Sequence, residues 1–151
     1  MKQAAGLLVY RWRNEKPEVF LVHPGGPCWK NKDDGAWVIP KGEFTENEDP
    51  FSAARREFRE ETGQEVDGTF TALPVLKQKG GKIVHAWAVE AEPDAEAVRS
   101  NTFPLEWPPK SGRFMDVPEV DRAAWFDMNT ARRKMLPSQL PLLDALEEIL
   151  P

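Results

Sequence analysis

The sequence has little of what disulfide cross-linking or membrane insertion requires. It contains a single cysteine, Cys28, which excludes an internal disulfide and is typical of a protein in a reducing compartment. No apolar run approaches the roughly 18 residues that a membrane-spanning helix needs. The first residues also lack the apolar stretch of a secretory signal. We therefore expect a cytoplasmic protein that does not bind membranes.

The chain also lacks an excess of positive charge. Its 20 lysines and arginines are outnumbered by 25 aspartates and glutamates, which gives a formal net charge of -5. This balance argues against general binding to nucleic acids, whose phosphate backbones attract basic surfaces. If an acidic protein handles an anionic substrate, it needs metal ions or local basic residues to do so.

Length and composition indicate one ordinary globular domain over residues 1–151. Hydrophobic residues make up 40% of the chain and charged residues 30%, and no repeat or low-complexity tract interrupts it. Periodicity and turn residues predict strands at 4–12, 18–23, 37–39, 70–77, 82–90 and 123–126, and helices at 50–62, 130–135 and 140–150. Because strands and helices do not alternate regularly, we expect an α/β fold with a mixed sheet between helices.

One long segment, residues 93–118, shows no clear pattern of its own. It contains five prolines and only weak periodicity. Such a composition predicts a long loop over the surface.

The clearest helix signals lie after residue 48. Asp49 and Pro50 suit the start of a helix, and Gly63 suits its end. Between them, apolar residues recur at helical spacing, from Phe51 to Phe58, and predict one packing face. We expect a helix over 50–62.

Three glutamates of this helix, Glu57, Glu60 and Glu61, share one arc. At 100° per residue the arc is roughly 100° wide, and it points away from the face of Phe51 and Phe58. Like charges at this spacing cost a few tenths of a kcal/mol per pair, a cost that a bound divalent cation would offset. On the helix pattern alone, the simpler interpretation is a solvated acidic face balanced by neighbouring arginines.

The wider spacing changes that interpretation. Seven positions keep a fixed register: Gly42, Glu48, Arg56, Glu57, Glu60, Glu61 and Gly63. This pattern resembles the signature box of the Nudix hydrolases. Two neighbours depart from the usual box: Phe58 stands in place of an aliphatic residue and Gln64 in place of an apolar one. The resemblance implies the Nudix fold, with a mixed sheet sandwiched between helices, and a pyrophosphohydrolase activity.

The resemblance also implies roles for single residues. Glu57, Glu60 and Glu61 match the positions that bind Mg²⁺, for which Mn²⁺ can substitute, and Gly42 matches the position whose carbonyl completes the metal shell. Arg56 matches the residue that orients the carboxylates, a task that suits its planar guanidinium. For Glu48, helix capping and pairing with the arginine remain equal alternatives.

The general base is the least fixed role in this family. Glu57 is the first candidate, because it would lie beside the metal. A glutamate outside the box can serve instead, and the later part of the chain offers Glu106 and Glu119. For both of these, a plain surface role is the simpler interpretation.

Basic residues near the box point to the substrate. Pro40-Lys41-Gly42 resembles the branch that acts on dinucleoside polyphosphates and diphosphoinositol phosphates, and Lys41 would bind a phosphate oxygen. Lys79 and Lys82 flank a glycine turn and are further candidates, although a solvated hairpin explains them equally well. Two loop tryptophans, Trp29 and Trp107, have the chemistry to stack on a nucleobase or to anchor their loops.

The sequence therefore predicts a Mg²⁺-dependent hydrolase of a nucleoside diphosphate linked to another moiety, with diadenosine tetraphosphate as the first example. ADP-ribose, nucleotide sugars, nucleoside triphosphates and diphosphoinositol polyphosphates are alternative substrates. A nucleotide-sensing Nudix domain without turnover is an alternative of another class, and a metal-independent scaffold is a third. We expect a small-molecule nucleotide or polyphosphate as the binding partner, and a monomer or a homodimer.

Overall fold

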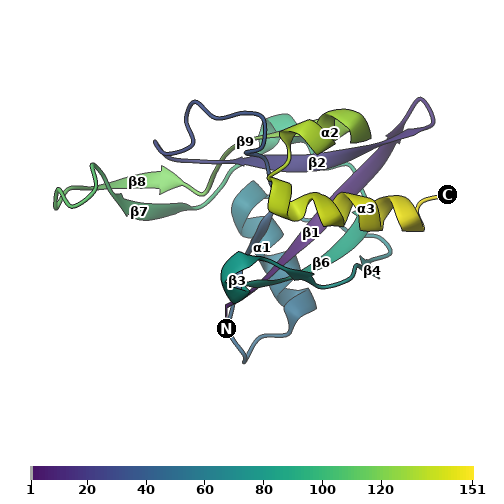
Figure 1. Ribbon diagram of the computed structural model, residues 1–151, viewed down its shortest axis with the longest axis horizontal. Coiled ribbons are helices and arrows are strands. Elements are labelled where there is room, and N and C mark those ends of the chain that lie inside the picture. The colour runs from purple at the N-terminus through teal and green to yellow at the C-terminus, as the bar shows by residue number, and fades with distance from the viewer. Residues whose placement is uncertain (1) are drawn as a thin grey trace.

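A central mixed sheet with helices on both faces forms the body of the protein (Figure 1). The computed structural model describes residues 2–151. The strands are β1 (Gln3–Arg13), β2 (Lys16–Pro24), β3 (Lys41–Phe44), β4 (Thr71–Ala72), β5 (Leu76–Lys77), β6 (Ile83–Glu90), β7 (Thr102–Glu106), β8 (Phe114–Pro118) and β9 (Val120–Asp127). The helices are α1 (Pro50–Thr62), α2 (Met128–Lys134) and α3 (Leu140–Ile149), with short 3₁₀ turns η1 (Lys79–Gly81), η2 (Ala95–Ala97) and η3 (Pro137–Gln139).

The main sheet has the order β4-β6-β1-β2-β9, with β3 paired to β1 and β5 paired to β6. Strands β1 and β6 run parallel, and the other pairs are antiparallel. Strands β1 and β2 form a hairpin. Its two turn residues, Asn14 and Glu15, both have positive φ, as the tight turns of twisted hairpins require. The mixed sheet that the sequence predicts is thus confirmed.

The core forms two layers because β1 is apolar on both faces. Leu7 of β1 packs with Phe58 of α1 on one side of the sheet. Leu8 packs with Leu143 of α3 on the other side. Side chains alternate across a strand, so neighbouring residues of β1 supply both layers. The parallel pairing with β6 thus lies in the middle of the molecule. Among residues 2–151, no helix is long and apolar enough to span a membrane.

Helix α1 begins and ends where the sequence predicts. The Asp49 carboxylate accepts from the Ser52 backbone N–H at 3.0 Å, which satisfies one free donor of the first turn. At the other end Gly63 is left-handed, with φ 73°, and its N–H donates to the Arg59 carbonyl at 2.7 Å. These two caps fix the helix between the sheet and the following loop.

Replacing Gly63 with alanine should lower the free energy of unfolding by more than the same change at Gly80. Both glycines have positive φ, which costs an L-residue about 1–2 kcal/mol. A Cβ at Gly63 would also lie 3.0 Å from the Arg99 carbonyl oxygen, whereas a Cβ at Gly80 would meet no atom within 4 Å. Urea unfolding of the two variants measures the difference. Equal losses would show that the Arg99 backbone moves aside freely.

The prediction of a long loop over 93–118 is wrong. This segment contains the 3₁₀ turn η2 and a separate hairpin of β7 and β8, which projects from the body in Figure 1. One face of the hairpin is covered near its base, where Val117 is buried and Phe103 is half-buried, whereas Phe114 is 68% exposed and Met115 45% exposed. Each strand has only five residues, so the periodic signal in the sequence is weak. Proline is also tolerated there, because both strands are edge strands.

The strand predicted at 37–39 is reduced to two isolated bridges, Val22 with Val38 and Trp37 with Met135. The regular strand comes just afterwards, as β3, where the sequence analysis expects no strand. Gly42 in this strand pairs with Ala5 of β1. The first residues of the box therefore lie on the central sheet, directly beside α1.

Candidate metal and substrate site

Three carboxylates from two parts of the chain converge beside β3. Glu57 and Glu61 of α1 and Glu119, between β8 and β9, each offer an oxygen, and these oxygens lie within 4.8 Å of one another. Glu57 and Glu61 are only 6% exposed. We call this group the carboxylate cluster. Such a group can hold a hard divalent cation through its oxygens.

Two of the three helix glutamates are buried, so the solvated acidic face that the helix pattern alone favours is not what forms there. Glu57 and Glu61 face the protein, because β3 and the segment around Glu119 lie against that side of α1. Phe51 is only half buried, and it packs against Phe70. A helical wheel separates polar from apolar sides, but it does not show which neighbouring elements cover the polar side.

Gly42 lies where β3 comes close to the cluster. A Cβ built at this position would overlap the carboxylate of Glu57. The missing side chain leaves the space that this carboxylate occupies. The sequence assigns Gly42 to the same site, and the structure places its backbone directly against Glu57.

Arg56 holds three glutamates of the box, Glu48, Glu57 and Glu60. Its Nε and Nη2 donate to both oxygens of Glu48 at 2.7 and 2.8 Å, in the bidentate geometry typical of arginine and carboxylate. Its Nη1 donates to Glu57 at 2.9 Å and to Glu60 at 3.1 Å. Glu48 therefore pairs with the arginine, while Asp49 caps the helix. Glu60 accepts a hydrogen bond from Arg56 and lies beside the carboxylate cluster, not within it.

The pKa values of all three carboxyl groups in the cluster are raised. Burial raises the pKa of Glu61 well above its usual value, and the nearby Glu119 and Glu57 add to the shift. The pKa of Glu57 is raised by burial against the opposing effect of Arg56, and that of Glu119 is raised by burial and by Glu60. Confined like charges disfavour ionisation. A divalent cation bound among them would remove that repulsion.

Of the two glutamates considered outside the box, only Glu119 belongs to the site. Its backbone N–H donates to the Asn101 carbonyl, and its own carbonyl accepts from Gly25 N–H, both at 3.0 Å. Glu106 instead accepts from the backbone N–H groups of Lys110 and Gly112 at the tip of the projecting hairpin. No spacing in the sequence distinguishes the two, because only the tertiary fold brings Glu119 to α1.

A pocket of about 260 Å³ adjoins the cluster. Glu61 and Glu119 line it together with Lys41 of β3, and two aromatic residues, Trp29 and Phe103, line it as well. It therefore joins carboxylates, an ammonium group and aromatic rings within one hollow.

Lys41 is the predicted phosphate-binding lysine that lines this pocket. Burial lowers its pKa to about 8, and the neighbouring Lys82 contributes to the shift. Lys82 thus lies close enough to act with Lys41. Lys79 is exposed in η1 and is not among the residues that line the pocket. The structure brings two of the three predicted lysines together.

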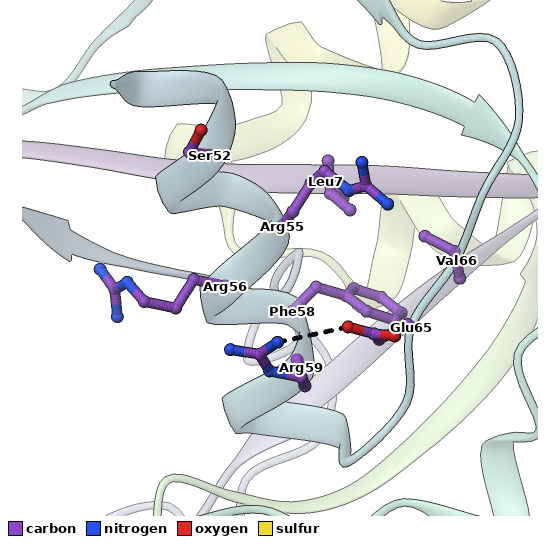
Figure 2. Close-up of a pocket in the computed structure, with 8 residues that line it drawn as sticks. All are labelled: Leu7, Ser52, Arg55, Arg56, Phe58, Arg59, Glu65 and Val66. Carbon is purple, nitrogen blue, oxygen red and sulfur yellow. Dashed lines mark hydrogen bonds and ion pairs between the residues drawn. The ribbon is translucent and has the colours of Figure 1, made fainter. Parts of the chain in front are cut away.

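A second hollow, of about 290 Å³, lies between α1 and the segment that follows it (Figure 2). Arg55, Arg56 and Arg59 line it, and in Figure 2 the side chain of Arg56 points away from those of the other two arginines. Arg59 pairs with Glu65 at 3.3 Å, and Arg55 pairs with Asp67 at 2.8 Å. None of the clustered carboxylates lines this hollow. The pocket that contains Lys41, Glu61 and Glu119 is therefore the better candidate for the functional site.

Comparison with known proteins bears on the fold and the family. The profile of the NUDIX domain family matches residues 2–146. The chain is similar to the solved structure of a Caenorhabditis elegans Ap4A hydrolase in a binary complex, at 23% identity and a TM-score of 0.67, over 98% of this chain and 96% of that one. It is similar to the NUDIX domain of Shewanella oneidensis NrtR complexed with ADP ribose, at 14% identity and a TM-score of 0.68, over 99% and 88%. A mutT/nudix family protein from Listeria innocua is 20% identical, with a TM-score of 0.64, over 97% and 92%. Likeness at these identities shows a shared fold.

Proposed function

The chain belongs to the Nudix family and is a pyrophosphohydrolase, and we propose that its substrate is a dinucleoside polyphosphate such as diadenosine tetraphosphate. The observation that carries this proposal is the pocket in which the carboxylate cluster meets Lys41. Carboxylates alone would repel a polyphosphate, and a lysine alone would bind it without reaction. Their combination, with a divalent cation, suits attack of water on a phosphoanhydride.

We propose that the cluster holds Mg²⁺, or Mn²⁺ in its place. Glu57 and Glu61 would supply carboxylate oxygens, with the Gly42 carbonyl and Glu60 beside them and Glu119 as an added candidate ligand. Bound there, the cation would neutralise phosphate oxygens and make the attacking water more acidic. Arg56 would keep Glu57 and Glu60 in place through its hydrogen bonds.

Glu57 is the proposed general base. Its carboxylate lies in the cluster and is held by Arg56, so that it stays at a fixed position beside the attacking water. Glu119 is the second candidate, since it reaches the same cluster from another part of the chain.

The substrate class rests on Lys41 and its surroundings. A half-buried ammonium group beside the cluster, with Lys82 next to it, suits a chain of several phosphates. The similarity to an Ap4A hydrolase supports this choice, and the similarity to a NUDIX domain that binds ADP ribose keeps ADP-ribose as the alternative.

A substrate panel tests the proposal. Diadenosine tetraphosphate, ADP-ribose, a nucleotide sugar, ATP and a diphosphoinositol polyphosphate are each incubated with the enzyme and Mg²⁺ or Mn²⁺, and the products are separated by ion exchange. We expect the highest kcat/KM for diadenosine tetraphosphate and no turnover with EDTA. A higher value for another compound would overturn the substrate class. Intact compounds throughout, together with binding of one of them, would favour a nucleotide-sensing domain.

Replacing Lys41 with methionine should raise KM for the preferred substrate by about 10-fold to 100-fold, because a direct charge-assisted contact with phosphate contributes about 1.5–3 kcal/mol. Lys79→Met serves as the matched control, since Lys79 is exposed and outside the pocket. Steady-state kinetics at saturating Mg²⁺ measure both. An equal effect of the two substitutions would show that only the net charge of this region matters.

A further inference from the structure

A buried glutamine near the end of the chain bonds to the segment that leads into the candidate site. Gln139 ends η3, just before α3, and is 0% exposed. Its side-chain Oε1 accepts from the Ile39 backbone N–H at 3.0 Å. Ile39 lines the pocket beside the carboxylate cluster, and Pro40 and Lys41 follow it directly. A residue 100 positions away therefore contacts the chain just before the proposed phosphate-binding lysine.

The segment 37–40 is held between the sheet and the chain that follows α2. On the side of the sheet, Val38 exchanges two backbone hydrogen bonds with Val22 of β2, at 2.9 and 3.0 Å. The Pro40 carbonyl accepts from the Leu7 N–H of β1 at 3.2 Å. The even-numbered residues of the segment therefore bond to the sheet.

The odd-numbered residues bond to the chain after α2. Trp37 N–H donates to the Lys134 carbonyl at 3.0 Å, and the Trp37 carbonyl accepts from Leu136 N–H at 2.8 Å, as in a parallel strand pair. In such a pair the next bond would join Ile39 N–H to the Leu136 carbonyl. That carbonyl instead accepts from Gln139 N–H at 2.9 Å, where the chain turns into η3. The Gln139 side chain thus supplies the acceptor for Ile39 at the point where the backbone turns away.

The Gln139 amide is more than a packing group. Ile39 N–H is a donor, so the amide oxygen must face it and Nε2 must point elsewhere. Nε2 is buried and has no hydrogen-bond partner among residues 2–151. A buried donor without a partner is costly, and an apolar side chain at this position would avoid that cost. It would leave the N–H of Ile39, also 0% exposed, unpaired instead. The bond to Ile39 is therefore what distinguishes glutamine from an apolar residue here.

We propose that Gln139 is a positioning residue, which holds Lys41 beside the carboxylate cluster by fixing the backbone at Ile39. This inference rests on the proposed function for the role of Lys41 in binding phosphate. Pro40 has no N–H, so Ile39 carries the last backbone donor before Lys41. If this donor loses its acceptor, the segment is favoured to move towards another partner or towards solvent. Lys41, two residues further along, would move with it.

Gln139→Met keeps the size of the side chain and removes the acceptor. It should raise KM for the preferred substrate by about 3-fold to 10-fold, as for one lost hydrogen bond, with kcat changed by less than about 3-fold. Gln139→Glu keeps an oxygen that faces Ile39. At about pH 6, where a buried carboxyl group is neutral, its KM should lie within about 2-fold of the wild-type value at the same pH.

The matched control is Leu142→Val. Leu142 is 1% exposed and lies in α3, within the same hydrophobic cluster as Ile39. Its truncation should lower the free energy of unfolding but leave KM unchanged, because the bond to Ile39 remains. Urea unfolding and steady-state kinetics of both variants are compared. An equal rise of KM in Leu142→Val would overturn the inference, because general loosening of α3 would then explain the effect.

A double-mutant cycle shows whether Gln139 acts through Lys41. If it does, Gln139→Met should have no further effect on KM once Lys41 is already methionine, because the group that it positions is gone. KM effects that multiply in the double variant would overturn the inference. They would show that the two residues act independently.

A measurement without substrate separates this inference from the proposed function. Amide hydrogen exchange and chemical shifts are followed by NMR in the wild type, Gln139→Met and Leu142→Val. In Gln139→Met the Ile39 amide should exchange at least about 10-fold faster, and the Lys41 side-chain signals should shift. Leu142→Val should show neither change. Unchanged Lys41 signals in Gln139→Met would overturn the inference even if hydrolysis occurs. If no compound of the panel is hydrolysed but both changes appear, the proposed function fails and the positioning of Lys41 stands.

Discussion

Glu61→Gln should lower kcat with Mg²⁺ by about 10² to 10³, the usual cost of removing one preorganised charged group from an active site. The substitution keeps the shape of the side chain but removes the negative charge that would bind the cation. Glu57→Gln should have an effect of similar size, because both carboxylates belong to the same cluster. Turnover of the preferred substrate over a range of Mg²⁺ concentrations measures both effects.

Stability should change in the opposite direction. Without metal, the Glu61 carboxylate is buried beside two other carboxylates, which raises its pKa. A neutral glutamine avoids this cost, so the free energy of unfolding of Glu61→Gln should be equal to or higher than that of the wild type. Glu65→Gln is the control for stability, since Glu65 is exposed in the loop after α1.

The activity measurement can contradict the proposed metal site. Unchanged turnover rates for both Glu57→Gln and Glu61→Gln would show that the metal site is elsewhere.

Gly42→Ala should reduce kcat/KM by about 10-fold to 100-fold and shift the Mg²⁺ dependence to higher concentrations, as for lost support of a metal ligand. The added methyl group would overlap the Glu57 carboxylate, which must then move out of the cluster. Arg56 opposes this movement, because it is bonded to the same carboxylate at 2.9 Å. The strain is therefore concentrated at the site itself.

The matched control for this variant is Glu43→Ala. Glu43 is the next residue of β3 and is exposed, so its truncation leaves the cluster untouched. Activity titrations with Mg²⁺ and thermal unfolding of both variants separate a local effect from general destabilisation. Wild-type Mg²⁺ dependence in Gly42→Ala would mean that Glu57 does not hold the cation.

The two ends of α1 could be predicted from the residues next to them, whereas the elements that pack against α1 could not. Asp49 and Gly63 act on the backbone within one turn of the helix, so their roles can be recognised from neighbouring residues. The direction in which Glu57 and Glu61 point depends on β3, which pairs with β1 through Gly42 and Ala5. Such a long-range pairing leaves no periodic signal in the helix sequence.

Glu119 and the hairpin show the same limitation in the second half of the chain. Glu119 reaches the cluster because its backbone bonds to Asn101 and Gly25, both distant in sequence. Phe103 and its pairing partner Val117 belong to strands without a continuous buried face, and the proline content of the segment is typical of a loop. The spacing of the box predicts the part of the site on one helix, whereas the rest depends on tertiary contacts.

The chain leaves the body at Thr102 and returns to it at Pro118, and these two residues form the first cross-strand pair of the hairpin. We call this pair the neck. Residues at the outer end of the hairpin, 107–113, can be added, removed or exchanged without moving β9 or the central sheet, since they lie beyond the paired strands. The neck also lies next to Glu119, so the base of the hairpin is beside the carboxylate cluster. If the proposed function holds, changes in the length and sequence of this outer end would alter the surface beside the site while the carboxylate cluster stays intact.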